Sequence, residues 1–80
     1  MKVRINGRRY RTKNWSPSGF RLDDFDGICA AGEQVRGVIL FKGCRGEVVA
    51  EAVRVGPGAA IGFRILEISS KIFLRLSGHR

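Results

Sequence analysis

Turns that contain glycine interrupt this chain at short intervals, and the stretches between them are rich in β-branched residues. Two-residue Asn-Gly turns and short glycine-rich loops typically join the neighbouring strands of an antiparallel sheet. The pattern predicts strands over the ranges 2–5, 8–15, 20–22, 34–41, 47–55 and 60–65. Eighty residues of which 44% are hydrophobic suffice for one small core. We therefore expect an all-β fold, a small antiparallel β-barrel of about six strands in a single domain over residues 1–80.

The hydrophobic period changes after residue 65. The apolar side chains that follow have the spacing of one face of a helix: Leu66, Ile72, Phe73 and Leu76. Ser69 or Ser70 could cap the start of this helix, and Gly78 could end it. The spacing predicts a short C-terminal helix that covers the mouth or edge of the barrel. The alternative is that its apolar face forms the contact of a homodimer.

The Asn6-Gly7 turn fixes the register of the first hairpin. Counting outward from the turn predicts these opposed pairs: Ile5 with Arg8, Arg4 with Arg9, Val3 with Tyr10, and Lys2 with Arg11. Opposed residues share a face of the sheet, so Val3 and Tyr10 should point inward. The cations expected to gather outside are Lys2, Arg4, Arg9 and Arg11. Lys13 and Trp15 are expected to continue that outer face along the second strand.

The next segment carries the motif Asn14-x-Ser16-x-x-Gly19, with Pro17 inside it. These residue types also suit an ordinary surface turn, because Asn and Ser bond to nearby backbone and glycine relieves steric limits. The spacing, however, resembles the signature of the PilZ domain family. The resemblance continues in order along the chain, through the segments Gly32-Glu33-x-Val35, Glu47 to Val55 and Ile61-Gly62-Phe63-Arg64-Ile65.

The resemblance to PilZ domains implies a six-stranded β-barrel with a C-terminal helix that binds the bacterial second messenger cyclic di-GMP. It implies a cytoplasmic regulatory receptor module that signals to a partner protein or a neighbouring domain. By position, Asn14, Ser16 and Gly19 would meet the guanine and phosphate groups of the ligand. Arginines from an N-terminal loop would stack on guanine and pair with phosphate, chemistry that suits a planar guanidinium.

The arginine half of the family motif matches less well. Arg4 and Arg8 have the spacing Arg-x-x-x-Arg, but Arg8 is only six residues before Asn14 and the hairpin register places the two arginines on opposite faces. Three explanations stay open. The arginine loop could precede Met1 in a longer chain, the domain could be a degenerate PilZ module that binds protein without nucleotide, or Arg9 and Arg11 could bind the ligand instead.

Fifteen Lys and Arg against seven Asp and Glu give a formal net charge of +8. Such an excess favours an anionic partner, although net charge also keeps small proteins in solution. Nucleic acid is therefore an alternative to a nucleotide. The residues for it would be Arg9, Arg11 and Lys13 on phosphates, with Trp15 or Phe20 stacked on bases.

No catalytic arrangement is visible, because the single histidine, His79, has no nucleophile in a plausible pattern with it. Cys29 and Cys44 lack the paired spacing of a zinc site and are expected to be free thiols. The segment 23–27 has three aspartates but not the alternating ligands of a calcium loop, so it is interpreted as a polar loop. We expect no enzyme, no metal and no cofactor.

The longest apolar runs are too short to cross a bilayer, and the basic N-terminal segment is not followed by the apolar region of a signal peptide. A cytoplasmic domain is expected, either alone or as the cytosolic part of a membrane-associated protein.

Overall fold

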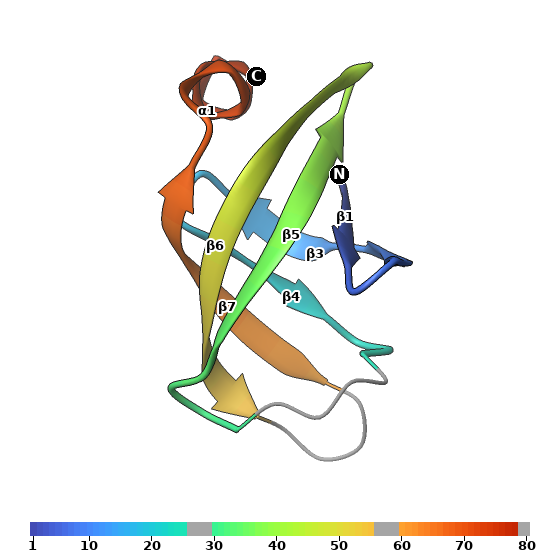
Figure 1. Ribbon diagram of the computed structural model, residues 1–80, viewed down its shortest axis with the longest axis vertical. Helices are drawn as coiled ribbons and strands as arrows, with labels where there is room; N and C mark the ends of the chain where they lie inside the picture. Colours follow the sequence, from blue (N-terminus) through green and yellow to red (C-terminus); the bar gives the residue numbers. More distant parts are fainter. Residues whose placement is uncertain (26–29, 56–59, 79–80) are drawn as a thin grey trace.

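One antiparallel sheet and one helix make up the fold (Figure 1). The computed structural model describes residues 1–25, 30–55 and 60–78, and of Val55 only the backbone. The strands are β1 (Lys2–Ile5), β2 (Arg8–Arg11), β3 (Lys13–Ser16), β4 (Gly19–Leu22), β5 (Gln34–Phe41), β6 (Cys44–Val55) and β7 (Ile61–Ile68). They lie in the order β2-β1-β5-β6-β7-β4-β3 and curl strongly into a half-barrel. The expected mostly-β antiparallel architecture with a short C-terminal helix is confirmed.

The described sheet has seven strands, whereas the sequence predicted about six. The difference arises at Thr12, which interrupts the strand that was predicted to run from residue 8 to 15. Its backbone N–H and its hydroxyl both donate hydrogen bonds to the carbonyl of Met1, at 3.1 and 2.9 Å. The chain pairs with β1 before Thr12 and with β4 after it. The two terminal strands of the sheet order, β2 and β3, are thus consecutive in the chain.

Two hairpin turns have the same left-handed backbone. The φ angles are +53° and +80° at Asn6 and Gly7, and +48° and +78° at Lys42 and Gly43. Two consecutive positive φ values suit the twist of a two-residue hairpin, which is why Asn-Gly predicts such a turn. The predicted register of the first hairpin is confirmed at all four pairs. The predicted loop 42–46 is wrong, since two residues complete the turn and β6 begins at Cys44.

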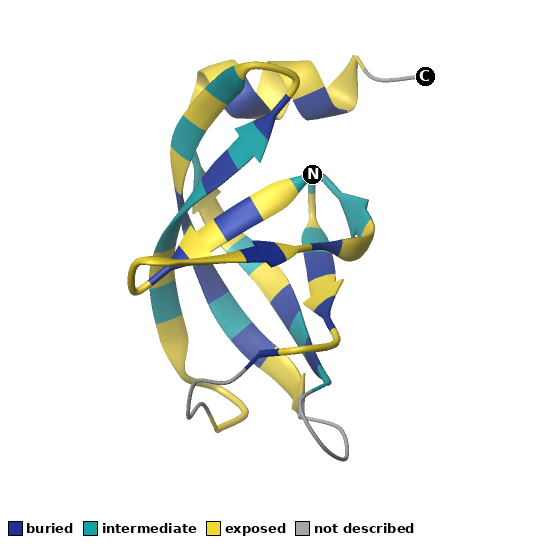
Figure 2. Cartoon of the chain, turned by 90° about the vertical axis from the view of Figure 1, so that its right-hand side faces the viewer, coloured by how far each residue is buried: buried dark blue, intermediate teal, exposed yellow. Residues whose placement is uncertain are grey.

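The core fills the concave side of the sheet, where buried and exposed residues alternate along the strands (Figure 2). Helix α1 (Ser70–Ser77) lies across one end of the half-barrel and buries Ile72 and Leu76. Leu66 was expected on the helix but belongs to β7, because that strand continues to Ile68. Gly78 follows the helix in a right-handed conformation, and its N–H donates to the Leu74 carbonyl at 3.0 Å. Ser69 is the N-cap but makes no side-chain capping bond.

Several expectations concern residues outside the described part of the chain. They are the turn at 56–58 between the last two predicted strands, the end of the polar loop at residues 26 and 27, Cys29 and His79. Within the described part of that loop, Phe25 is buried, and its ring lies 5.3 Å from the ring of Tyr10. Cys44 is a free, half-buried thiol. No helix among the described residues is long and apolar enough to span a membrane.

The outer face of the first hairpin places Arg4 opposite Arg9 and Lys2 opposite Arg11. Like charges directly across an antiparallel pair destabilise it. We expect the double substitution of Arg9→Gln and Arg11→Gln to leave the melting temperature unchanged or to raise it slightly. Thermal unfolding followed by circular dichroism measures this. A drop of several degrees would mean that these arginines make a structural contribution that the register does not explain.

Candidate functional site

A hollow of about 710 Å³ lies on the outer face of the sheet, where β3, β4, β6 and β7 meet. Its volume is in the range of small-molecule sites in proteins. All three residues of the Asn-Ser-Gly motif line it, so the structure brings together the residues that the motif singled out. The lining residues are Asn14, Ser16, Ser18, Gly19, Phe20, Arg21, Val53, Arg54, Ala60, Ile61, Gly62 and Phe63.

Asn14 forms a bulge in the hairpin of β3 and β4. Lys13 pairs with Arg21 and Ser16 pairs with Gly19, so two residues of β3 oppose one residue of β4. The φ of Asn14 is +48°, a left-handed value that asparagine tolerates better than most residues. The bulge shifts the alternation of side chains along β3. It therefore exposes the amide of Asn14 at the hollow.

The bulge also corrects the expected position of Trp15. The sequence placed Trp15 on the outer face beside Lys13, but its ring packs against the core and meets the Phe41 ring edge-on at 4.9 Å. Phe20 likewise points inward, stacked on Phe63 at 5.3 Å. The two aromatic residues proposed to stack on nucleic acid bases are thus packed within the protein.

Ser16 closes the tight turn at Pro17 and Ser18. Its hydroxyl oxygen accepts a hydrogen bond from the Ser18 backbone N–H at 3.2 Å and lies 2.8 Å from the Ser18 hydroxyl. Such local bonds are the usual function of serine in turns. The two hydroxyls sit together at the rim of the hollow, where a ligand oxygen could accept a bond from either of them.

Gly19 is required for the approach of two strands. Its φ is not among the positive values, so a left-handed backbone is not the reason for this glycine. A Cβ built on Gly19 would instead lie 2.5 Å from the carbonyl oxygen of Phe63. Real Cβ atoms do not approach backbone so closely. The motif glycine therefore lets β4 lie close to β7, and it adds no side chain to the hollow.

Arg21 and Arg54 are the arginines of the hollow. Gly62 of β7 pairs with Arg21 on one side and with Arg54 on the other, so the two arginines flank a residue without a side chain. Neighbouring strands are about 4.8 Å apart, which places the two arginine Cα atoms roughly 10 Å from each other. That separation leaves a slot over Gly62 between the two guanidinium groups.

The predicted ligand arginines, Arg9 and Arg11, lie on β2 and do not line the hollow. The sequence could have indicated Arg21, because it lies two residues after Gly19 on the same strand and so shares its face. Strict alternation along the strand would place Arg54 on the face of Ala50 and Ala52. An irregular register between Ala52 and Arg54 turns the arginine outward, whereas Ala52 is buried.

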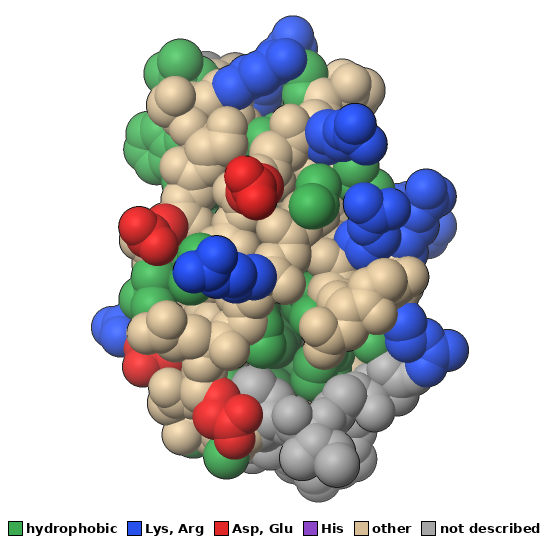
Figure 3. Space-filling view, in the orientation of Figure 1, with side chains coloured by type: hydrophobic (Ala, Val, Ile, Leu, Met, Phe, Trp, Pro, Cys, Tyr) green, Lys and Arg blue, Asp and Glu red, His purple; other side chains and the backbone are tan. Residues whose placement is uncertain are grey.

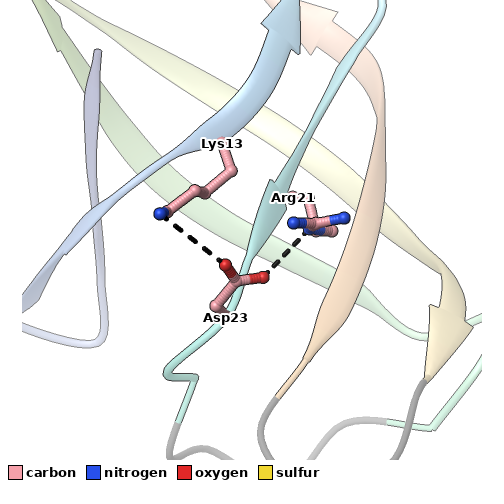
Figure 4. Close-up of polar contacts among 3 residues, drawn as sticks. All are labelled: Lys13, Arg21 and Asp23. Carbon is pink, nitrogen blue, oxygen red and sulfur yellow. Dashed lines mark hydrogen bonds and ion pairs between the residues drawn. The ribbon is translucent and has the colours of Figure 1, made fainter.

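Among the residues that the structure describes, the carboxylates near the hollow pair with Arg21 and Arg64 but not with Arg54. The Arg21 Nε donates to Asp23 Oδ1 at 2.9 Å, and the Lys13 Nζ lies 3.9 Å from Asp23 Oδ2 (Figure 4). Arg64, beside the hollow, donates to Glu51. Within the described part of the chain, Arg54 has no ion pair or side-chain hydrogen bond. An anion entering the slot would meet Arg54 and the remaining N–H donors of Arg21.

The chemistry of the hollow is that of non-covalent anion binding. It offers two guanidinium groups, one amide and two hydroxyls, next to the exposed apolar side chain of Val53. The described residues include no cluster of three or more potential metal ligands.

No family model, curated protein or solved structure matches this chain in the comparisons. The resemblance to PilZ domains therefore rests on the motif residues quoted above.

Proposed function

We propose that this domain is a cyclic di-GMP receptor of the PilZ type, and that the ligand binds in the hollow between β3, β4, β6 and β7. The observation that carries the proposal is that Asn14, Ser16 and Gly19, which the motif singles out, line the same hollow as Arg21 and Arg54. A regulatory module of this kind would signal to a partner protein or a neighbouring domain.

The strand arrangement agrees with a PilZ-like barrel. The sheet has seven strands, but β2 and β3 are separated only by Thr12. If these two are counted as one bent strand, the number becomes six. The resemblance also implies a C-terminal helix, and α1 supports the proposal to that extent.

The ligand chemistry follows from the groups around the slot. Cyclic di-GMP carries two phosphodiesters and two planar guanines. A phosphodiester over Gly62 would accept charge-assisted bonds from Arg54 and Arg21, and guanidinium planes can stack on a guanine face. The amide of Asn14 and the Ser16 hydroxyl would bond to polar edges of the same ligand. In this arrangement Arg21 and Arg54 take the part that the family resemblance gives to an N-terminal arginine pair.

The motif side chains can be tested without disturbing the fold. Asn14→Gly removes the amide and keeps the left-handed backbone, which an alanine would strain. Ser16→Ala removes the hydroxyl from an exposed turn. Loss of one bond to a charged group costs about 1.5 to 3 kcal/mol, so each variant should bind cyclic di-GMP roughly ten- to a hundredfold more weakly. Isothermal titration calorimetry measures the affinity, and circular dichroism verifies the fold.

The arginine contribution has a matched control on the same strand. Arg54→Gln and Arg45→Gln each remove one positive charge from β6, but only Arg54 lines the hollow. We expect Arg54→Gln to weaken binding about tenfold or more and Arg45→Gln to have little effect. Equal losses for the two variants would indicate general electrostatic attraction and would place the ligand elsewhere.

A protein-interaction module without nucleotide binding is the second candidate, and one observation favours it. Helix α1 exposes Leu74 by 70%, on the side away from its buried residues, and Phe73 by 44%, at the flank of its buried face. Absence of calorimetric binding to cyclic di-GMP, together with self-association that Leu74→Ser abolishes in analytical ultracentrifugation, would support this candidate over the first.

A further inference from the structure

The β1–β2 hairpin has a strongly basic outer face. Its outward side chains are Lys2 and Arg4 of β1 and Arg9 and Arg11 of β2, which we call the basic ribbon. All four residues are exposed, and the register sets them in two directly opposed pairs. The pairs lie two residues apart along each strand, or roughly 7 Å. Four cations therefore lie within a small area of the surface.

The charges of the basic ribbon are not neutralised within the described part of the chain. None of the four cations forms an ion pair there. The carboxylates of Asp23 and Glu51 instead contact Lys13, Arg21 and Arg64, on β3, β4 and β7. Across the sheet, Arg4 of β1 pairs with Val38 of β5, and Val38 pairs with Glu47 of β6. Glu47 is the first residue with a carboxylate along this line of paired residues, so Val38 lies between it and Arg4.

The space-filling view shows the same division of charge (Figure 3). Most of the Lys and Arg side chains in this view follow the right-hand side, on which β1 lies, and a few lie at the top, in the middle and at the left. Asp and Glu lie over the middle and the left, and none is seen among the cations on the right. Placing like charges opposite each other destabilises the hairpin, and a dense anion would remove that repulsion.

The surroundings of the basic ribbon favour one kind of polyanion. The exposed large hydrophobic side chains among the described residues are Val53, Leu66, Phe73 and Leu74, and none is on β1 or β2. An anionic bilayer attracts each cation of the basic ribbon by only about 1 kcal/mol, and stronger docking adds an apolar side chain that inserts between the lipids. Binding of a single strand relies on aromatic rings that stack on bases. Tyr10 of β2 is buried, and Trp15 packs against Phe41.

We infer that the basic ribbon binds the phosphate backbone of double-stranded nucleic acid. A duplex carries one negative charge per about 1.7 Å of its axis, a density that matches several cations a few ångströms apart. The contacts are to phosphates alone, so binding does not depend on base sequence. This surface is separate from the hollow proposed for cyclic di-GMP, whose lining includes no residue of β1 or β2.

The test is fluorescence anisotropy with a labelled DNA duplex of about 20 base pairs, titrated from about 50 to 200 mM salt. Each phosphate neutralised contributes about −0.9 to the slope of log K against log salt, so four cations predict a slope of roughly −3 to −4. In a ribbon variant with Arg4→Gln, Arg9→Gln and Arg11→Gln, we expect the affinity at low salt to fall at least tenfold and the slope to become about 3 less steep.

A matched control removes the same charge elsewhere. The control variant carries Arg64→Gln, Lys71→Gln and Arg75→Gln, on β7 and α1. It should keep the slope of the unsubstituted chain within about 1. Thermal unfolding of both variants establishes that each is folded.

Four results would overturn the inference. They are equal losses in the ribbon and control variants, no duplex binding at low salt, a single strand bound more than tenfold tighter than the duplex, and binding to phosphatidylserine vesicles that depends on the ribbon while duplex binding does not.

Discussion

Gly19→Val is expected to destabilise the domain by about 3 kcal/mol or more, and so to lower its melting temperature by at least about 12 °C. A Cβ at this position would meet the Phe63 carbonyl oxygen at 2.5 Å, and the next nearest atoms are also backbone. A flexible side chain could move aside, but the backbone of β7 is held by its pairing with both β4 and β6. Relief would require the two strands to separate next to the core residues Phe20 and Phe63.

Gly62→Val is the control for that result. Gly62 lines the same hollow on the neighbouring strand, but the nearest atom to its added Cβ would be the Arg54 Cβ at 3.7 Å, an ordinary contact. Valine is favoured in strands, and glycine within a strand costs about 0.5 to 1 kcal/mol relative to alanine. Chemical denaturation should therefore show Gly62→Val to be at least as stable as the unsubstituted chain. A Gly19→Val variant as stable as this control would contradict the strand approach described above.

The parts of the fold that the sequence predicts correctly depend on local backbone chemistry. Asn6-Gly7 encodes its own turn, because both residues accept positive φ and the twist of the strands then sets the pairing. The four cross-strand pairs of the first hairpin follow by counting. The same reasoning failed at Lys42-Gly43, because lysine gives no comparable signal for a left-handed conformation.

The errors arise where strict alternation fails. The bulge at Asn14 turns Trp15 toward Phe41, and the irregular register after Ala52 turns Arg54 out of the core face. A bulge inserts one residue and reverses the face of every side chain that follows. Its position depends on the partner strand, so it cannot be read from one strand alone. Thr12 is a similar case, because its bonds to Met1 depend on tertiary placement.

The candidate site also combines residues that the sequence predicts from a local motif with a residue that only the pairing of distant strands brings to it. Asn14, Ser16 and Gly19 were predicted together because they occur within six residues. Arg54 is 35 positions after Gly19, and only the pairing of β6 with β7 brings it to the hollow. Each motif residue also has a structural task, at the bulge, in the turn or at the strand approach. Affinity measurements must therefore accompany stability measurements for any change at these three positions.

Gly62→Val is also expected to weaken binding of cyclic di-GMP about a hundredfold or more. The added side chain would occupy the slot between Arg21 and Arg54, where the proposed phosphodiester lies. Displacement from two guanidinium groups loses at least two charge-assisted bonds of about 1.5 to 3 kcal/mol each, which corresponds to a factor of a hundred or more. Calorimetric titration of a variant with an undiminished melting temperature would isolate this loss from any effect on folding.

Gly62→Ala gives an intermediate case, because a methyl group fills only part of the slot and should cost less affinity than valine. A graded loss from glycine through alanine to valine, with stability constant or rising, is the result that blocking of the slot by side-chain volume predicts. Unchanged affinity in Gly62→Val would show that no ligand phosphate lies between Arg21 and Arg54. The ligand-binding role proposed for Arg54 would then have to be abandoned, whatever the effect of Ser16→Ala, because the slot over Gly62 is the only feature that brings Arg54 to the ligand.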